Sequence, residues 1–307
     1  MPFPDLRTFV ERLRHDRNLV EVTTPVDPYL EAAEIHRRVV ATGGPALLFT
    51  QVRGADFPLV TNLFGTAHRA ELAFGDRPHR LVQQLVQLFE TILPPTATKL
   101  WGARDLGFEL LKIGLKKQSH GGPVTEVVTD DVHLERLPTL TTWPDDGGPF
   151  ITLPLVFTQH PDGRGHNLGM YRLHVHDRQT TGMHWQIGKG GGFHYNVAES
   201  RGDALPATVF GGERLRLTEG PWPHPLVASA EFALIGEVPP HERKPEGPFG
   251  DHYGYYSLQH DYPLFRVHTM AHRRDAIYPA TVVGKPRQED WRRCWNREGC
   301  WFWTGSG

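Results

Sequence analysis

The sequence predicts an α+β protein, with an N-terminal α/β region followed by a β-rich domain. Two observations predict this fold class. Over about the first 100 residues, apolar positions at helical spacing alternate with short strand-like runs, whereas beyond residue 122 the runs are short, turn-bounded and rich in β-forming residues. With 307 residues, the chain is long enough for two domains with a sizeable core.

The N-terminal region is predicted to begin with an amphipathic helix. Apolar residues of segment 6–13 recur at i, i+3, i+4 and i+7, and Asp5 before them is a suitable helix cap. The same criteria predict further helices at residues 31–40, 66–74 and 78–91, and strands at residues 19–22, 46–49 and 57–60.

Seven strand-like runs follow, and their close spacing favours a sheet sandwich or a barrel. They cover residues 124–128, 151–158, 167–175, 207–210, 226–236, 263–270 and 281–283. We therefore predict an N-terminal domain at residues 1–115 and a β-rich domain at residues 116–290. The tail at residues 291–307 is atypical, because it holds four of the eight tryptophans and both cysteines.

Composition argues against several classes of protein. Lys and Arg number 33 against 35 Asp and Glu, so the chain has no basic footprint for nucleic acid or for a membrane surface. No apolar run approaches the ~18 residues that a membrane span needs. Two cysteines cannot form a disulfide framework, and the first residues lack the order of a secretory signal, so a cytoplasmic location is expected.

Arg172 is a candidate functional residue because it ends a strand-like segment that starts at Asn167. Alternation places Asn167, Gly169 and Tyr171 on one face and Arg172 on the other. A buried arginine in a sheet is costly unless an anion pairs with it. The alternative is an edge strand that leaves Arg172 in solvent.

Two carboxylates, Glu246 and Asp251, flank a Gly-Pro-Phe-Gly turn. Such a pair can divide its roles, with one group kept ionised by a cation and the other acting as an acid. The alternative is a solvated surface turn. The tyrosines at residues 253, 255 and 256 argue against that alternative, because aromatic rings favour partial burial.

A glycine-rich segment, residues 188–192, contains Lys189 and could wrap a phosphate, although a flexible hairpin explains it equally simply. The chain also has 18 histidines. His174 and His176 share a strand face, while His184 and His194 flank the glycines. No zinc-binding spacing occurs, so solvated or structural histidines are the alternative to a metal site.

Taken together, these segments resemble the UbiD family of decarboxylases, which use prenylated flavin mononucleotide (FMN). The resembling segments follow the family's order at residues 45–49, 59–65, 137–152, 167–172, 180–185, 245–256 and 272–286. The resemblance implies an N-terminal α/β region and then a split β-barrel like that of flavin reductases. It also implies that the family's C-terminal domain is missing after about residue 290.

The resemblance implies non-oxidative decarboxylation of an aromatic or unsaturated carboxylic acid, with polyprenyl-4-hydroxybenzoate of quinone biosynthesis as the favoured substrate. Arg172 and Glu246 match the family's paired arginine and glutamate, and Asp251 matches the acid that protonates carbon. The cofactor-binding residues are expected to be Thr152, Asn167, Met170, Tyr171, Arg172 and Lys189. Asn167 also matches one ligand of a Mn²⁺ ion, with K⁺ as a further candidate ion.

The same resemblance implies particular partners. These are a small carboxylic acid substrate, a flavin prenyltransferase that supplies the cofactor, and further copies of the chain in a homo-oligomer. A polyprenylated substrate would bring the protein close to a membrane surface.

The sequence also departs from the family. A metal-binding histidine aligns with Gly188, so His184 or His194 would have to replace it. After residue 212 the chain continues with sequence that lies roughly 30 residues further on in the family. The missing segment would contain about two strands and a metal-binding glutamate. Glu213 does not match that glutamate. We therefore predict weak binding of metal and flavin.

Two other functions stay open at this stage. One is an inactive remnant that associates with other subunits through exposed sheet edges. The other is a split-barrel flavin oxidoreductase, against which the Arg172, Glu246 and Asp251 set argues, because hydride transfer needs no paired acid.

Overall fold

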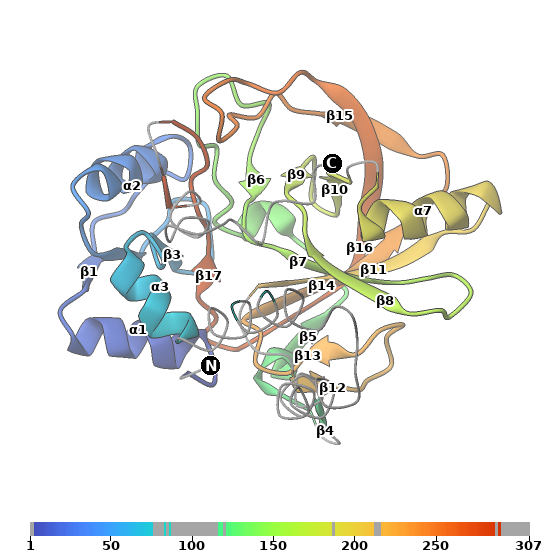
Figure 1. The fold of residues 1–307 in the computed structure, drawn as a ribbon, viewed down its shortest axis with the longest axis horizontal. Helices are drawn as coiled ribbons and strands as arrows, with labels where there is room; N and C mark the ends of the chain where they lie inside the picture. The colour runs from blue at the N-terminus through green and yellow to red at the C-terminus, as the bar shows by residue number, and fades with distance from the viewer. Residues whose placement is uncertain are drawn as a thin grey trace.

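The structure is a computed structural model that describes residues 3–75, 83, 86, 116–118, 121–185, 188–211, 216–285 and 288–289. A small α/β unit lies beside a larger curled sheet (Figure 1). Most of the predicted helix at 78–91, the region around Glu213 and the tail at 291–307 lie outside the described residues. Within the described ranges, no helix is long and apolar enough to cross a membrane.

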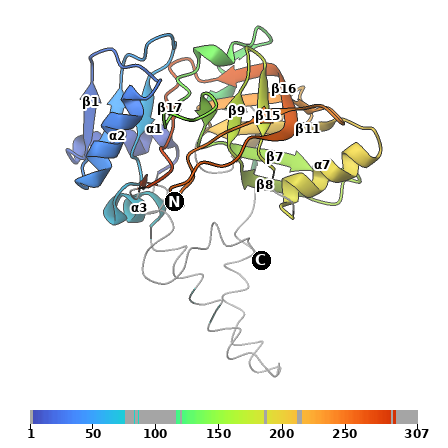
Figure 2. The ribbon, with the colours of Figure 1, turned by 90° about the horizontal axis from the view of Figure 1, so that it is seen from above.

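The N-terminal unit packs helices on both faces of a four-stranded sheet of order β1-β2-β3-β17 (Figure 2). Its elements are α1 (Leu6–His15), β1 (Leu19–Val22), α2 (Glu31–Ala41), β2 (Ala46–Phe49), β3 (Leu59–Thr61), α3 (Ala67–Phe74) and β17 (Tyr278–Pro279). Alternate residues of β2 face opposite sides, so Leu48 packs with α1 and Leu47 packs on the side of α2. The Asp5 cap is confirmed, since its carboxylate accepts a hydrogen bond from Thr8 N at 2.9 Å.

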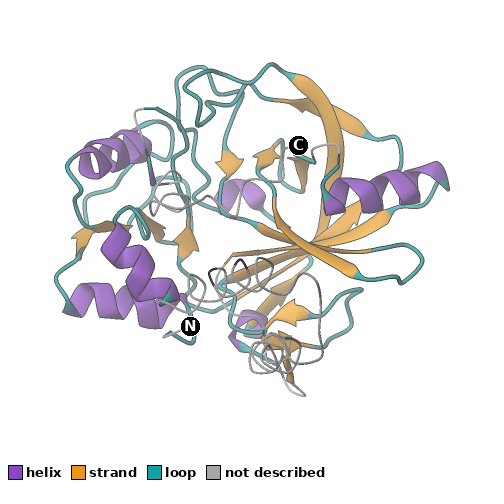
Figure 3. Ribbon diagram, viewed as in Figure 1, coloured by secondary structure: helices purple, strands orange, loops and turns teal. Residues whose placement is uncertain are grey.

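The larger unit is a ten-stranded sheet whose strand pairs are antiparallel and which curls into a half-barrel (Figure 3). The main order is β6-β9-β10-β16-β14-β11-β7-β8, and β15 and β5 also pair with β16. The strands are β5 (Val127–Thr129), β6 (Phe150–Ile151), β7 (Leu155–Gln159), β8 (His166–Met170), β9 (Leu173–Val175), β10 (Thr180–Met183), β11 (Leu205–Gly211), β14 (Phe232–Val238), β15 (Arg243–Glu246) and β16 (His260–His272).

A three-stranded sheet, two short 3₁₀ helices and one α-helix complete the larger unit. They are β4 (Lys116–Gln118), β12 (Arg216–Thr218), β13 (Leu226–Val227), η1 (Pro123–Thr125), η2 (Leu134–Arg136) and α7 (Gly190–Ser200).

Several predicted strands differ from those observed. Residues 124–128 form the end of η1 and only part of β5, residues 167–175 divide into β8 and β9, and residues 226–236 divide into β13 and β14. Residues 281–283 form no strand. Strand β3, which pairs with β17 just before these residues, ends at Thr61, and the φ of 57° at Asn62 turns the chain out of the ladder.

The glycine-rich segment at 188–192 does not form the flexible hairpin that was one expectation from the sequence, because most of it starts a helix. Gly190 begins α7, which packs against β7, β8 and β11. The buried positions of this helix are Gly191, His194, Tyr195 and Ala198, a regular i, i+3, i+4, i+7 pattern. Packing of this face therefore outweighs the low helix propensity of three successive glycines.

Glu289 joins the two units. Its fully buried carboxylate accepts hydrogen bonds from Asn62 N at 3.1 Å, Phe64 N at 2.7 Å and Thr281 Oγ1 at 2.9 Å. Thr281 N in turn donates to Thr152 Oγ1 at 2.9 Å. One side chain thus links the end of β3 to the segment before β7.

We expect Glu289→Ala to lower the free energy of unfolding by about 3 kcal/mol, because two buried backbone N–H groups lose their acceptor. Urea unfolding followed by circular dichroism measures this change. The control is Glu242→Ala, which removes an exposed ion pair with Arg266 and should have little effect. Equal destabilisation by the two variants would contradict a joining role for Glu289.

Candidate active site

Three polar side chains from separate segments of the large sheet meet at Glu246. Arg172 lies between β8 and β9, His184 directly follows β10, and Glu246 ends β15. Arg172 Nε donates to Glu246 Oε1 at 3.0 Å, and His184 Nδ1 lies 2.7 Å from the same oxygen. The Glu246 side chain is fully buried, and Arg172 is only 17% exposed, so the arginine is paired rather than solvated.

Neighbouring rings and a hydroxyl hold the two basic groups in place. The Arg172 guanidinium lies 4.4 Å from the centre of the Phe249 ring, and its Nη2 is 3.4 Å from Ser257 Oγ. The His184 ring lies 4.4 Å from the ring of Tyr262. Arg172 therefore has contacts on three sides, which restrict its rotation.

The electrostatics of the site keep Glu246 ionised. Burial acts to raise the pKa of Glu246, but the hydrogen bond and charge of His184 and the charge of Arg172 outweigh it, so this pKa lies below its ordinary value. Burial lowers the pKa of His176 to about 4 and also lowers that of His174. Glu246 Oε2 is buried without a hydrogen-bond partner among the described residues.

Asp251 lies near this cluster in sequence but forms no hydrogen bond or ion pair with Arg172 or Glu246 within the described part of the chain. Its carboxylate forms an ion pair with His252, whose backbone N–H also donates to it at 2.5 Å. The expected burial of the following tyrosines is wrong, since Tyr253 is 61% and Tyr255 is 78% exposed. A tight turn, closed by the Gly254 N to Asp251 O bond of 2.9 Å, projects this loop outward.

The residues predicted to bind the cofactor separate into two places. Asn167 Nδ2 donates to the Tyr171 hydroxyl at 3.1 Å, and Gly191 N at the start of α7 donates to the same hydroxyl at 3.3 Å. Lys189 is the N-cap residue of α7, and Met170 is 43% exposed. Thr152 lies elsewhere, against Thr281.

The glycine at position 190 leaves room for Asn167. A Cβ there would lie 2.4 Å from Asn167 Oδ1, so any other residue would displace the Asn167 amide from the first turn of α7. The Lys189 ammonium has no partner within the described ranges, and the first N–H groups of a helix attract anions. Lysine, amide and helix N-terminus together fit the phosphate of a flavin mononucleotide.

The described residues do not fit a manganese ion. Across those residues, no group of three or more His, Cys, Asp or Glu side chains could hold a metal. Gly188 has no side chain, and its φ of 84° would strain any other residue. The two proposed replacements are engaged elsewhere, His184 with Glu246 and His194 with Thr158 Oγ1 at 2.9 Å.

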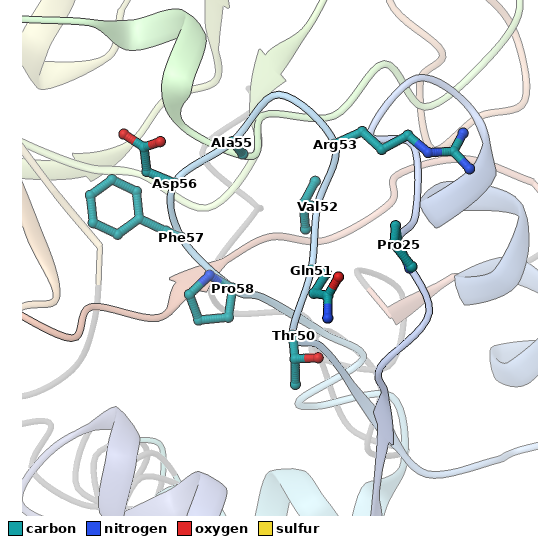
Figure 4. A pocket seen from close by; sticks show the side chains of 9 residues that line it. All are labelled: Pro25, Thr50, Gln51, Val52, Arg53, Ala55, Asp56, Phe57 and Pro58. Carbon is teal, nitrogen blue, oxygen red and sulfur yellow. The ribbon is translucent and has the colours of Figure 1, made fainter.

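A cavity of about 350 Å³ lies in the N-terminal unit, around the connection between β2 and β3 (Figure 4). Its lining residues are Pro25, Thr50, Gln51, Val52, Arg53, Ala55, Asp56, Phe57 and Pro58. None of the site residues predicted from the sequence lines it. The chemistry of the Glu246 cluster therefore does not depend on this cavity.

Comparisons with known proteins place the chain in a family. The model of the UbiD N-terminal domain (3-octaprenyl-4-hydroxybenzoate carboxy-lyase N-terminal domain) matches residues 10–89. The model of the UbiD 3-octaprenyl-4-hydroxybenzoate carboxy-lyase Rift-related domain matches residues 116–214 and 207–286. The chain belongs to the UbiD family, which confirms the resemblance seen in the sequence.

Two similar proteins support membership in this family, and both are longer than this chain. An uncharacterized protein of Chlamydia caviae is 46% identical over 320 positions, which cover 94% of this chain and 54% of that protein. A protein of Chlamydia pneumoniae, named as a subunit of 4-hydroxybenzoate decarboxylase, is 45% identical over 314 positions, covering 93% and 53%. The chain spans about half the length of these relatives. The 320-position alignment with the Chlamydia caviae protein is longer than the chain itself, so that protein has residues within the matched stretch that this chain lacks.

Solved structures share the fold. Vanillic acid decarboxylase of Sedimentibacter hydroxybenzoicus, in its closed form, has a TM-score of 0.79 at 21% identity, covering 95% of this chain and 66% of that one. The UbiD-class enzyme HmfF of Pelotomaculum thermopropionicum, solved in complex with FMN, has a TM-score of 0.74 at 23% identity, covering 91% and 65%.

The contact of His184 with Glu246 was not predicted from the sequence. The two residues are 62 positions apart, and Ser257 is 85 positions from Arg172. No local pattern reports such contacts, because they depend on strand pairing. The one available signal was that His184 directly follows a short β-forming run, residues 180–183.

We expect Glu246→Gln to be less stable than the unchanged protein by about 2 kcal/mol at pH 7, because charge-assisted hydrogen bonds are lost. The pKa of Glu246 is lowered on folding, so its stabilising contribution is complete above the ordinary value of 4.5 and is lost as the pH falls below it. Denaturant unfolding at pH 7 and below pH 4.5 should show the difference narrowing. A difference that is constant with pH would contradict the ionised state of Glu246.

Proposed function

We propose that this chain is the flavin- and substrate-binding part of a UbiD-type decarboxylase that acts on aromatic or unsaturated carboxylic acids. The observation that carries the proposal is the buried pair of Arg172 with Glu246, which presents a guanidinium beside the Phe249 ring. The relatives support it, since the Chlamydia pneumoniae protein is named for 4-hydroxybenzoate decarboxylase and HmfF was also solved in complex with prenylated FMN.

Each residue has a distinct proposed task. Glu246 and Ser257 hold Nε and Nη2 of Arg172, while Nη1 has no partner within the described residues and is left to bind a substrate carboxylate. The family resemblance assigns to Asp251 the donation of the proton that replaces the departing CO₂ on carbon, which requires this carboxyl to leave its pair with His252 and to take up a proton first. Prenylated FMN, when bound, would accept the electrons released at that carbon; Lys189, Asn167 and the N-terminus of α7 would hold its phosphate.

The finer assignments follow from the family. We propose polyprenyl-4-hydroxybenzoate, in ubiquinone or related quinone biosynthesis, as the substrate, and a flavin prenyltransferase as the source of the cofactor. The proposed barrel is the split type, for which the curled sheet is suitable. The proposed assembly is a homo-oligomer in the cytoplasm, near a membrane surface when its substrate carries a polyprenyl chain.

The proposal predicts that Arg172→Ala and Asp251→Asn each reduce decarboxylation at least ~100-fold, because one removes carboxylate binding and the other the proton donor. The assay supplies prenylated FMN and 4-hydroxybenzoate and measures phenol by chromatography. Asp275→Asn is the control, because Asp275 is an exposed carboxylate that pairs with Arg7 on the surface. Unchanged turnover in either active-site variant, with the fold verified by circular dichroism, would refute its assigned role.

We also expect the chain to retain less than one flavin per molecule after desalting, even when Mn²⁺ is added, because the described residues offer no complete metal site. The absorption spectrum of the desalted protein gives the stoichiometry directly, with a sample lacking Mn²⁺ as the control. A full equivalent of flavin, retained only with Mn²⁺, would show that this expectation is wrong.

A further inference from the structure

The metal-binding role considered for His184 from the sequence does not fit the structure, in which His184 makes the shorter of the two contacts to Glu246. We propose that His184 is a positioning residue that fixes the Glu246 carboxylate, and through it Arg172, for binding of a substrate carboxylate. This inference rests on the proposed function of the site, and it adds a residue to the machinery that orients the substrate.

The sheet register builds this contact. Strands β10 and β16 pair with Gly182 opposite Leu264, and the same antiparallel step brings His184 opposite Tyr262. On the other side of β16, Lys244 of strand β15 pairs with Tyr262. Glu246 lies two residues further along β15, opposite His260. The imidazole therefore rests on the Tyr262 ring, at 4.4 Å, and reaches Glu246 from a fixed position.

The hydrogen-bond pattern shows what His184 does for Glu246. An ionised carboxylate only accepts hydrogen bonds, so His184 Nδ1 and Arg172 Nε both donate to Oε1. Oε2 receives no donor from the described residues and is buried. With two donors on one oxygen, the carboxylate is held in one orientation and Arg172 keeps its Nη1 free.

Loss of the His184 side chain would leave the Glu246 carboxylate free to rotate. Glu246 Oε2 and His176 Nε2 both lie beside Gly182, where a Cβ would be 3.5 Å from the first and 3.2 Å from the second. Neither atom has a hydrogen-bond partner within the described ranges. A carboxylate held by Arg172 alone could rotate toward that second polar group, and the guanidinium would then lose its anchor.

The first test uses the protein without cofactor and measures the titration of the Glu246 carboxyl by carbon NMR, assigned by its absence in Glu246→Gln. The groups that face Glu246 are Arg172, His174, His176, His184 and Tyr262. We expect His184→Leu to raise the pKa of Glu246 by about one unit or more, since a donor to a charged group is lost. His184→Asn, which keeps an N–H near the position of Nδ1, should restore most of the shift.

A matched control is His15→Asn, because His15 is an exposed histidine far from the site. An unchanged Glu246 titration in folded His184→Leu would overturn the proposal. So would a folded His184→Asn that behaves like His184→Leu, because the effect would then come from packing rather than from the donated hydrogen bond.

The second test measures binding of 4-hydroxybenzoate by calorimetry. We expect about tenfold weaker binding in His184→Leu and near-normal binding in His184→Asn. If the unchanged protein binds no 4-hydroxybenzoate, the proposed function fails for this substrate class, while the titration still decides whether His184 orients Glu246. If binding is normal in His184→Leu, the positioning role fails although the proposed function stands.

Discussion

A carboxylate as deeply buried as Glu246 stays ionised only if cations and hydrogen-bond donors surround it, and this requirement organises the site. Arg172 and His184 supply those donors from two other segments of the sheet. Their meeting depends on β16, which pairs with β10, β14, β15 and β5 and so sets the register of several segments at once. The pairing of these strands therefore also brings together the side chains whose charges compensate Glu246.

Two further buried carboxylates, Glu289 and Glu231, lie where the two units of the protein meet. Glu289 is buried between the end of β3 and the segment that reaches Thr152. Glu231, also buried, accepts a hydrogen bond from Ile277 N at 2.9 Å and lies 3.5 Å from both Arg7 and Arg273. Because a buried carboxylate needs partners in specific directions, each of these residues fixes how one unit sits on the other.

Membership in the UbiD family and the local geometry lead to different expectations for the two implied cofactors. The N-terminus of α7, with Lys189 and Asn167, has the chemistry of an anion site and suits a phosphate. The described residues around Asn167 do not suit a hard divalent cation, because Gly188 contributes no ligand. The Arg172 and Glu246 arrangement and the expected manganese site are thus separable in this chain.

Local patterns in the sequence determined the elements that depend on local physics. The helix after Asp5 follows from apolar spacing and a cap. The cost of burying Arg172 predicted an anionic partner, but it did not indicate which residue that partner is. Only the tertiary structure decided that glycines 190–192 start a helix and that His184 joins Glu246. Both outcomes arise from packing and register between segments that are far apart in the chain, and local propensity does not encode those contacts.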